Sequence, residues 1–267
     1  MKQLKLMVLT LTLLMGTMFT SCMDSGESGP QQWAGVVKVN DRMGYVTFTD
    51  AAGTELIPTN TIPVTLNARM AYIYCQVDEG QDLSTNPKSI KITLLADPTG
   101  IDATAITTPK VGESGDVTTN APVGSLSFAS GYSTVAPFQF SENTIVLPVL
   151  YRVKNVTTTE DIKNELAKHT FTLVCYTDDI KSGDTILKLY LRYKVEDEPA
   201  AIAERATRTS SFKAYEISQI LREYTLNSGQ AKPAKITIVA QQNEYNNKLE
   251  DTSTTEKVYE IEYKTAE

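Results

Sequence analysis

The sequence predicts an all-β protein with a small N-terminal barrel and a C-terminal antiparallel β-sandwich. Hydrophobic residues recur at every second position in successive segments, which is the period of a half-buried strand. Turns rich in Asp and Gly separate these segments. With 267 residues, of which 41% are hydrophobic and 21% charged, the chain is long enough to bury a core in each of two domains.

The first segments of the body alternate clearly between apolar and polar side chains. Residues 44–50 and residues 71–77 both show this pattern. Behind the first of them, residues 50–53 (DAAG) predict a hairpin loop in which Gly53 takes a positive φ. We expect four to six short strands between residues 33 and 108, which is the size of a small barrel.

The clearest strand pattern lies later, in residues 187–195, where apolar side chains occupy every odd position. Similar patterns occur in residues 170–176, 234–240 and 258–263. One polar face per strand favours antiparallel sheets with one side in solvent. About seven such strands between residues 120 and 265 predict a sandwich.

Helical signals are few and short. Residues 159–168 have a capping threonine, early acids and a late lysine. Pro199 suits the first turn of a helix over residues 199–205, and residues 217–221 could form one further turn. None of these segments is long enough to build a layer of the fold.

A change in composition between about residues 97 and 124 marks the expected domain boundary. The hydrophobic pattern is weak in residues 101–109, and residues 111–116 have the composition of a loop. We therefore assign residues 33–108 to the barrel and residues 120–265 to the sandwich. We find no internal repeat that relates the two halves.

Residues 1–21 have the features of a lipoprotein signal peptide. Lys2 and Lys5 precede an apolar run of residues 6–19, which would rise about 21 Å as a helix and is too short for a bilayer core of about 30 Å. The segment 19–22 (FTSC) resembles a bacterial lipobox, in which cleavage falls before a cysteine that receives a diacylglyceryl group. Phe19 stands where the lipobox usually has Leu. No later stretch is apolar enough to span a membrane, so we expect the exported remainder to be soluble.

Cys22 is therefore the predicted lipidation site, and residues 22–32 are the predicted lipidated cysteine and flexible tether. The alternative is an unmodified cysteine in a cleaved or disordered leader. Two or three acyl chains would anchor the protein firmly, since each buried methylene contributes about 0.8 kcal/mol. The ten residues after Cys22 (MDSGESGPQQ) would span about 16–19 Å as a flexible chain.

The charge of the chain argues against nucleic acid as a partner. Removal of residues 1–21 leaves 23 basic and 32 acidic residues, a formal charge of −9. Such a body is repelled by nucleic acid phosphates and by anionic lipid headgroups. We expect lipid rather than charge to hold the protein at the membrane.

The leader and several body segments resemble the NigD-like family of Bacteroidota lipoproteins. These segments are residues 33–39 (WAGVVKV), 43–50 (MGYVTFTD), 56–58 (LIP), 211–217 (SFKAYEI) and 235–238 (KITI). The resemblance covers nearly the whole mature chain and implies an N-terminal OB-type barrel with a C-terminal β-sandwich. Its motifs are structural, so Cys22 is the only functional residue that it transfers. Asp24 and Glu27 look like the acidic surface-export signals of such lipoproteins. An outer-membrane anchor facing either the cell surface or the periplasm is expected.

Residues that build catalytic and metal sites are scarce. His169 is the only histidine, has no nucleophile motif around it, and is interpreted as a surface or helix-end residue. Zinc sites need several close Cys or His ligands. Cys75 and Cys175 fall on apolar strand faces, so we expect buried free thiols, with an inter-domain disulfide as the alternative. We expect no catalytic residue, no metal and no cofactor.

The local carboxylate clusters are Asp178-Asp179 and residues 196–198. We interpret them as solvated turn acids, because a glycosidase needs two carboxylates across a cleft whereas neighbours on a strand point to opposite faces. Asp178, Asp179 and Asp184 form an alternative calcium site of oxygen ligands, although they lack EF-hand spacing. No phosphate-binding glycine motif is present.

A sugar-binding platform is an alternative use of the aromatic residues. Trp33 is the only tryptophan, and Tyr72, Tyr74 and Tyr190 lie on the polar faces of their strands. Strand propensity alone also places tyrosines at such positions.

The sequence thus favours a non-enzymatic, membrane-anchored envelope lipoprotein that acts as an interaction or structural module. An unknown protein or glycan is its expected partner. The alternatives are a glycan-binding surface lipoprotein, a fimbrial subunit assembled by strand donation, and an enzyme. The enzyme hypothesis would need two carboxylates about 5–10 Å apart in a pocket.

Overall fold

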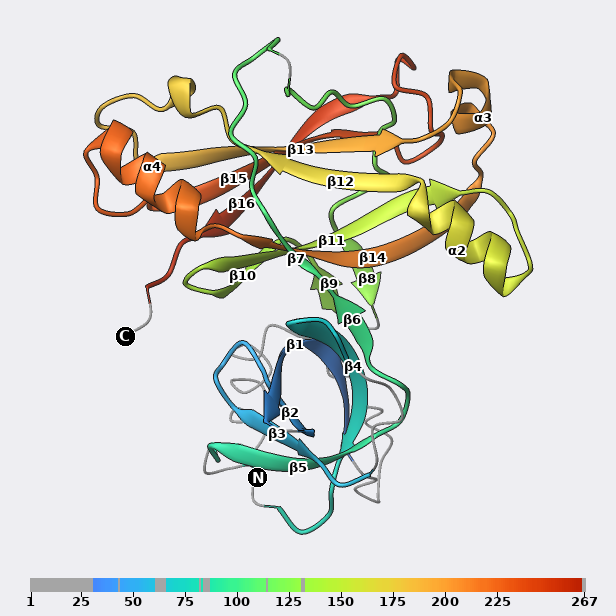
Figure 1. Cartoon of the computed structure of the whole chain (residues 1–267), viewed down its shortest axis with the longest axis vertical. Helices are drawn as coiled ribbons and strands as arrows, with labels where there is room; N and C mark the ends of the chain where they lie inside the picture. Colours follow the sequence, from blue (N-terminus) through green and yellow to red (C-terminus); the bar gives the residue numbers. More distant parts are fainter. Residues whose placement is uncertain are drawn as a thin grey trace. The chain divides into compact units, whose positions relative to one another are not determined.

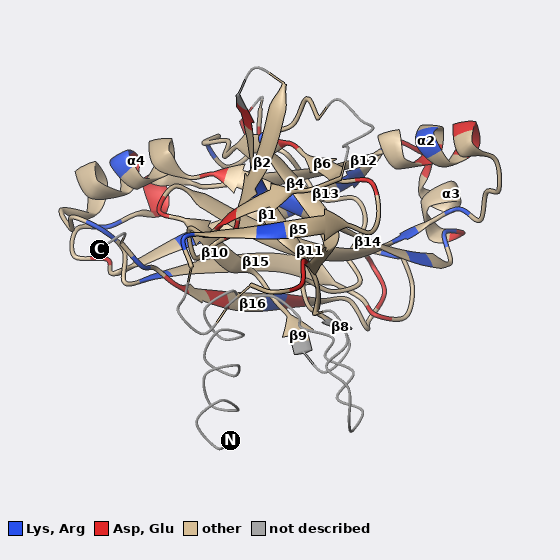
Figure 2. Cartoon of the chain, turned by 90° about the horizontal axis from the view of Figure 1, so that it is seen from below, with Lys and Arg blue, Asp and Glu red and all other residues tan. Residues whose placement is uncertain are grey.

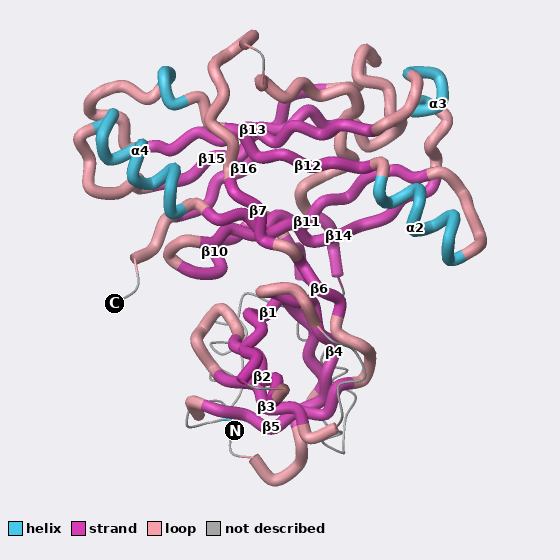
Figure 3. The backbone as a smooth tube through the Cα atoms, in the orientation of Figure 1, coloured by secondary structure: helices cyan, strands magenta, loops and turns pink. Residues whose placement is uncertain are grey.

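Strands dominate the structure and helices are few, which confirms the predicted all-β class (Figures 1 and 3). The computed structural model describes residues 31–265, except 43, 61–65, 82, 84–86, 114 and 131–132. Within this part, every helix is too short or too polar to cross a membrane. The described residues divide into two compact units, residues 31–103 with 129–135 and residues 104–128 with 136–265.

The first unit contains a closed barrel of five strands. These are β1 (Gln32–Arg42), β2 (Tyr45–Thr49), β3 (Glu55–Pro58), β4 (Met70–Val77) and β5 (Ser89–Leu94). The long strand β1 pairs with β2 through residues 38–42 and with β4 through residues 32–38, so it closes the barrel. The order β1-β2-β3-β5-β4, with β3 and β5 parallel, is that of an OB-type barrel.

The alternating apolar residues fill the inside of this barrel. Trp33 and Val37 of β1, Phe48 of β2, and Ile73 and Cys75 of β4 belong to one buried cluster. The short strand β6 (Thr99–Ile101) adds to the free side of β4. A separate two-stranded sheet consists of β8 (Phe128–Ser130) and β9 (Ser133–Val135).

The turn between β2 and β3 has the predicted conformation. Asp50 accepts hydrogen bonds at Oδ1 from the N–H groups of Ala52 (2.9 Å) and Thr54 (2.8 Å). Gly53 has φ +86°, a value that side chains with a Cβ rarely adopt. An acid and a glycine at this spacing therefore fix the register of the hairpin.

The second unit is a sandwich of two four-stranded sheets. One sheet has the order β10 (Phe138–Ser141), β11 (Thr144–Val153), β14 (Thr207–Glu216) and β7 (Ala103–Ala105). The other has the order β12 (His169–Val174), β13 (Ile186–Val195), β15 (Lys235–Gln242) and β16 (Thr255–Glu262). Leu147 of β11, Tyr215 of β14 and Leu189 of β13 share one buried cluster, so the sheets pack face to face.

One strand pair departs from the predicted antiparallel sandwich. The pairs β10–β11, β11–β14, β12–β13 and β15–β16 are antiparallel, but β13 and β15 run parallel. Between them the chain crosses to the opposite sheet as β14 and then returns beside β13. Alternation within a strand shows which face is buried, but it does not give the direction of the neighbouring strand.

Three α-helices and one 3₁₀ turn accompany the sandwich in the described residues: α2 (Thr159–Ala167), α3 (Pro199–Ala203), α4 (Ser218–Ser228) and η2 (Thr177–Asp179). The first two α-helices match the predicted segments, although Thr158 and not Thr159 caps the first. Helix α4 is longer than the single turn expected at residues 217–221. Its buried residues Ile220, Tyr224 and Ser228 are four apart, and Gly229 ends it with φ +73°. Because a tyrosine and a serine stand on the buried face, the helix lacks the regular apolar spacing by which the sequence would have shown its full length.

Residues 104–128 belong to the second unit, although the sequence assigned residues 104–108 to the barrel and none of 109–119 to either domain. They supply hydrogen-bond partners to strand edges. Thr107 pairs with β12, and the Asn120 side chain donates to Val195 O (2.9 Å) and accepts from Val195 N–H (2.8 Å). Gly124 donates to Leu150 O (2.7 Å), where a Cβ would lie 3.2 Å from that oxygen.

Candidate functional site

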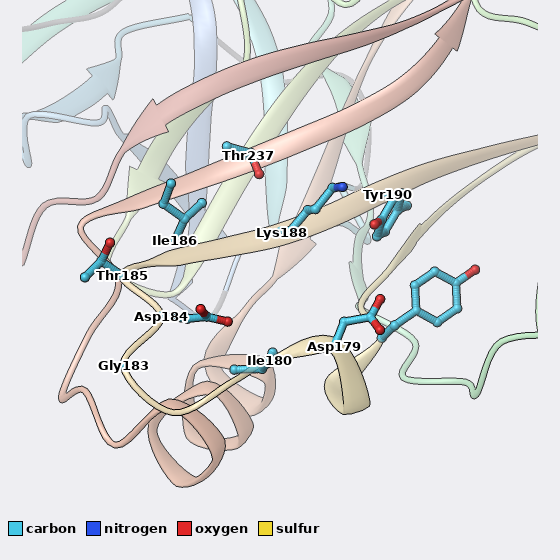
Figure 4. Close-up of a pocket in the computed structure, with 10 residues that line it drawn as sticks. Asp179, Ile180, Gly183, Asp184, Thr185, Ile186, Lys188, Tyr190 and Thr237 are labelled. Atoms are coloured by element: carbon cyan, nitrogen blue, oxygen red, sulfur yellow. The ribbon is translucent and has the colours of Figure 1, made fainter.

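A pocket of about 580 Å³ lies on the outer face of the β12-β13-β15-β16 sheet (Figure 4). Its floor consists of Ile186, Lys188 and Tyr190 from β13 and Thr237 from β15. These residues alternate with leucines and isoleucines of the sandwich core, so they point away from it. The volume falls in the range of about 300–1,000 Å³ typical of small-molecule sites.

The wall of the pocket is the segment from Tyr176 to Thr185, which joins β12 to β13. Lys181 N–H donates to Asp184 Oδ2 (2.7 Å), and Asp184 N–H donates to Lys181 O (3.1 Å). Gly183 between them has φ +90°, a conformation that glycine adopts readily because it has no Cβ. The hydroxyl of Tyr224 in α4 donates to Asp184 O. The wall is therefore fixed by its own turn and by the neighbouring helix.

The Tyr190 ring is held between two cations on the same face of β13. Lys188 Nζ lies 4.9 Å from the ring centroid, and the guanidinium carbon of Arg192 lies 5.1 Å from it. Because Lys188 precedes Tyr190 by two residues and Arg192 follows it by two, the cations occupy opposite sides of the ring. A hydrogen bond with Tyr190 raises the pKa of Lys188.

A second tyrosine completes this arrangement. The Tyr176 ring meets the Tyr190 ring edge-on, with centroids 5.3 Å apart. Arg192 donates to the Tyr176 hydroxyl (2.9 Å), which in turn donates to Asp116 Oδ1 (2.8 Å). Hydrogen bonds from Gly112 N–H and the Tyr176 hydroxyl lower the pKa of Asp116, so its carboxylate stays ionised. Both rings are thus fixed in place by contacts within the protein.

The pocket contains an acidic and a basic side chain that both retain hydrogen-bonding capacity. No described group donates a hydrogen bond to the exposed carboxylate of Asp179, and no described carboxylate lies within ion-pair distance of Lys188. The hydroxyls of Thr185 and Thr237 also line the pocket. A ligand there meets hydrogen-bond acceptors, donors and hydroxyls within one cavity.

Sequence reasoning missed this pocket. Lys188, Tyr190 and Arg192 stand at alternate positions of the clearest predicted strand, and this cation–aromatic–cation spacing was the available signal. The contribution of the β12–β13 segment and of Thr237 depends on strand pairing, which the sequence does not display.

Trp33 does not contribute to the aromatic platform that the sequence offered as an alternative. Trp33 is only 5% exposed and lies in the barrel core, so it cannot join an exposed patch. Tyr74 is 37% exposed and donates to Gln32 Oε1. Tyr190 belongs to the second unit and lies in the pocket.

His169 directly follows the end of helix α2, as expected, but it is buried and not at the surface, which corrects that part of the prediction. Its Nδ1 lies 2.6 Å from the Tyr193 hydroxyl and its Nε2 lies 3.3 Å from Glu165 Oε1. Burial lowers the pKa of His169 against the opposing effect of Glu165, so the ring is neutral at pH 7. The end of helix α2 covers the histidine, and periodicity in so short a helix did not reveal which face is covered.

Arg205 links this histidine to the acids of residues 196–198. Arg205 donates to both oxygens of Glu165 (2.8 and 3.2 Å) and to Asp197 Oδ2 (3.1 Å). Lys154 and Lys168 also contact Asp197 Oδ2, at 3.1 and 3.2 Å. Asp197 is therefore a member of an ion-pair network and not a solvated turn acid. These cations hold its pKa well below the usual range.

Glu165 is ionised although it is buried. Burial by itself raises its pKa, but hydrogen bonds from Lys154 N–H, Arg205 and His169 outweigh burial and lower the pKa. We define Glu165, His169, Tyr193, Asp197 and Arg205 as the buried polar cluster. All its charged groups are paired within the protein, so it serves the stability of the unit.

Cys75 and Cys175 are free and buried, as expected from their positions on apolar strand faces. Burial, with a smaller contribution from Asp78, raises the pKa of Cys75 to about 12. Burial and Asp179 raise the pKa of Cys175 to about 12. Thiols with such pKa values are protonated at neutral pH and unreactive.

The alternative calcium site at Asp178, Asp179 and Asp184 gains no support. Across the described residues, no three His, Cys, Asp or Glu side chains are grouped as metal ligands. Asp184 instead binds the backbone of its own turn. Cys22 and most of the tether lie outside the described residues.

No protein-family model and no curated protein matches the chain. Among solved structures, a candidate lipoprotein from Bacteroides fragilis NCTC 9343 is 95% identical, covers 89% of this chain and 100% of its own, and superimposes with a TM-score of 0.82. A protein of unknown function (DUF1344) from Bacteroides vulgatus ATCC 8482 is 11% identical, over 88% of this chain and 92% of its own, with a TM-score of 0.55. The second likeness shows a common fold alone.

The Bacteroides fragilis structure shows the family of this chain. At 95% identity over the whole of the solved chain, the two proteins share the same fold and belong to the same family. This chain therefore belongs to the lipoproteins of the Bacteroidota.

Proposed function

We propose that this lipoprotein is a non-enzymatic binding protein of the cell envelope, held at the outer membrane by a diacylglyceryl group on Cys22. The leader residues and the tether support the anchor, and the family resemblance supports a NigD-like protein facing the cell surface or the periplasm. Basic and acidic residues are interspersed over the described chain (Figure 2). That distribution offers little attraction to an anionic membrane, so lipid has to supply the attachment.

The observation that carries the binding role is the preformed pocket on the sandwich. Its wall is fixed by the turn at Asp184 and its floor by the ring of Tyr190 between two cations. A rigid site loses little conformational entropy when a ligand binds. Asp179 and Lys188 retain hydrogen-bonding capacity within it.

Binding is favoured over catalysis by the environment of the two carboxylates. Asp179 and Asp184 both line the pocket, which is the arrangement that a glycosidase would need. The general acid of such an enzyme is typically a carboxyl group in a buried, apolar environment. Asp179 is exposed, and Asp184 accepts a backbone N–H. The single histidine is committed to the buried polar cluster.

Metabolic labelling with a palmitate analogue tests the anchor. Full-length wild-type protein and the Cys175→Ser variant should both incorporate label and sediment with membranes. Cys22→Ser should incorporate none and appear in the soluble fraction. An unmodified Cys22 sulfur, seen by mass spectrometry of the mature protein, would contradict the proposal.

A hydrolysis assay tests the non-enzymatic part. Neutral oligosaccharides incubated with the purified full-length protein should remain intact when analysed by chromatography. Cleavage that disappears in Asp179→Asn would show that the pocket is catalytic.

A further inference from the structure

We propose that the pocket on the second unit binds a short neutral carbohydrate, held by hydrogen bonds and not by aromatic stacking. This inference rests on the proposed binding function and names the chemical class of its ligand. It differs from the sugar platform expected from the sequence, because Trp33, Tyr72 and Tyr74 take no part in it.

Hydroxyl groups match the polar lining better than any other ligand group. The carboxylates of Asp179 and Asp184 only accept hydrogen bonds, whereas the Lys188 ammonium only donates them. A hydroxyl both donates and accepts, so adjacent hydroxyls of one ligand can satisfy a carboxylate and the ammonium together. The hydroxyls of Thr185 and Thr237 extend the same pattern.

Other ligand classes leave part of the lining unmatched. A phosphate or carboxylate ligand would pair with Lys188 but face the carboxylates of Asp179 and Asp184. A polyamine would pair with those acids but be repelled by Lys188. An apolar ligand would remove water from all three charged groups without replacing its hydrogen bonds, which costs several kcal/mol.

Apolar contact with the ligand comes from the aliphatic residues of the pocket and not from its aromatic rings. Lys188 and Arg192 flank the Tyr190 ring, and Tyr176 is only 7% exposed, so neither ring offers a free face for stacking. Ile180 and Ile186 supply apolar surface in the same pocket, and Ile186 is 47% exposed. Figure 4 shows both side chains at the edge of the cavity. Their apolar surface can pack against the C–H groups of a sugar ring.

Binding to full-length lipidated protein in detergent tests this inference by calorimetry. The probes are short neutral oligosaccharides with α- and β-linked hexoses and N-acetylhexosamines, with inorganic phosphate and spermidine as charged probes. We expect at least one oligosaccharide to bind and both charged probes to fail. Asp179→Asn and Lys188→Met should each weaken that binding about tenfold, because each removes a charged hydrogen bond.

Matched variants control for general effects of charge. Asp178→Asn removes the neighbouring acid, which does not line the pocket, and Lys194→Met removes an exposed lysine further along β13. Both should bind the oligosaccharide as the wild type does. Tyr190→Phe keeps the ring and should weaken binding less than Lys188→Met.

Three results would overturn the inference: no oligosaccharide binds, Asp179→Asn and Lys188→Met bind as tightly as the wild type, or phosphate or spermidine binds instead. Palmitate labelling at Cys22 is independent of all three. A failure of the carbohydrate assignment is thereby distinguished from a failure of the proposed envelope anchor.

Discussion

Arg205 is the most buried charged side chain among the described residues, at only 1% exposed. It shows why the loss of one partner of a buried ion pair destabilises a protein strongly. Its guanidinium binds both oxygens of Glu165, which is itself 4% exposed. We expect Arg205→Met to lower the free energy of unfolding by about 3–5 kcal/mol, because it leaves a buried carboxylate without its partner. Urea denaturation measures the change. Arg222→Met on the exposed face of α4 is the control and should stay within about 0.5 kcal/mol of the wild type. A loss below about 1 kcal/mol for Arg205→Met would show that Glu165 finds another partner.

The buried His169 predicts a specific dependence of stability on pH. Its pKa is lowered in the folded state by burial, so below the ordinary value of about 6.5 the unfolded chain binds a proton that the folded chain does not. Stability should therefore be constant with respect to this group above pH 6.5 and fall as the pH drops below it. Glu165, whose pKa is also lowered, adds a further loss below its unfolded value of about 4.5. Urea midpoints measured from pH 8 to pH 5 should show the first effect in the wild type and not in His169→Gln. An equal slope in both proteins would assign it to other groups.

At the scale of elements, helix α2 shows how a local signal fixes a boundary. Thr158 Oγ1 accepts from Asp161 N–H at 3.1 Å, and Thr158 is exposed, so its contribution is the cap and not packing. We expect Thr158→Ala to destabilise the protein by about 1 kcal/mol, measured by chemical denaturation. Thr158→Ser keeps the hydroxyl and should stay within a few tenths of a kcal/mol. Equal stability of the two variants would mean that another group caps the helix.

Alternation predicted the main strands well, because a half-buried strand must alternate. Residues 187–195 lie within β13 and residues 71–77 lie within β4. The same reasoning underestimated α4, whose buried face carries Tyr224 and Ser228. It could not reveal that β13 and β15 run parallel, since direction depends on the path of the chain between them.

At the scale of the whole molecule, the proposed lipid anchor predicts how the protein leaves a membrane. Without residues 1–21 the chain would carry a formal charge of −9, so electrostatic attraction to anionic lipid would be unfavourable. About 1 M salt shortens the screening length to roughly 3 Å but leaves acyl chains inserted. Washing membranes with such salt should leave the protein in the pellet, whereas mild detergent should release it. Release by salt alone would mean that a charged partner holds it.

Site residues were predicted correctly where neighbouring residues decide their environment, and incorrectly where distant residues do. Cys75 and Cys175 were predicted as buried free thiols because each lies on the apolar face of its own strand. His169 and Asp197 were misassigned, because their partners Tyr193 and Arg205 are distant in sequence or lie on another element. The pocket escaped prediction for the same reason, since Thr237 reaches it only through the pairing of β13 with β15.

The sequence by itself determined the all-β class, the main strands, the helix α2 and the lipoprotein class. These follow from composition, from periodicity and from short motifs, which act through neighbouring residues. Only the tertiary structure decided the order and direction of the strands, the pairing of Arg205 with Glu165, and the cavity beside Tyr190. Each of these depends on contacts between residues far apart in the chain, and the free energy of such contacts exists only after the sheets have packed.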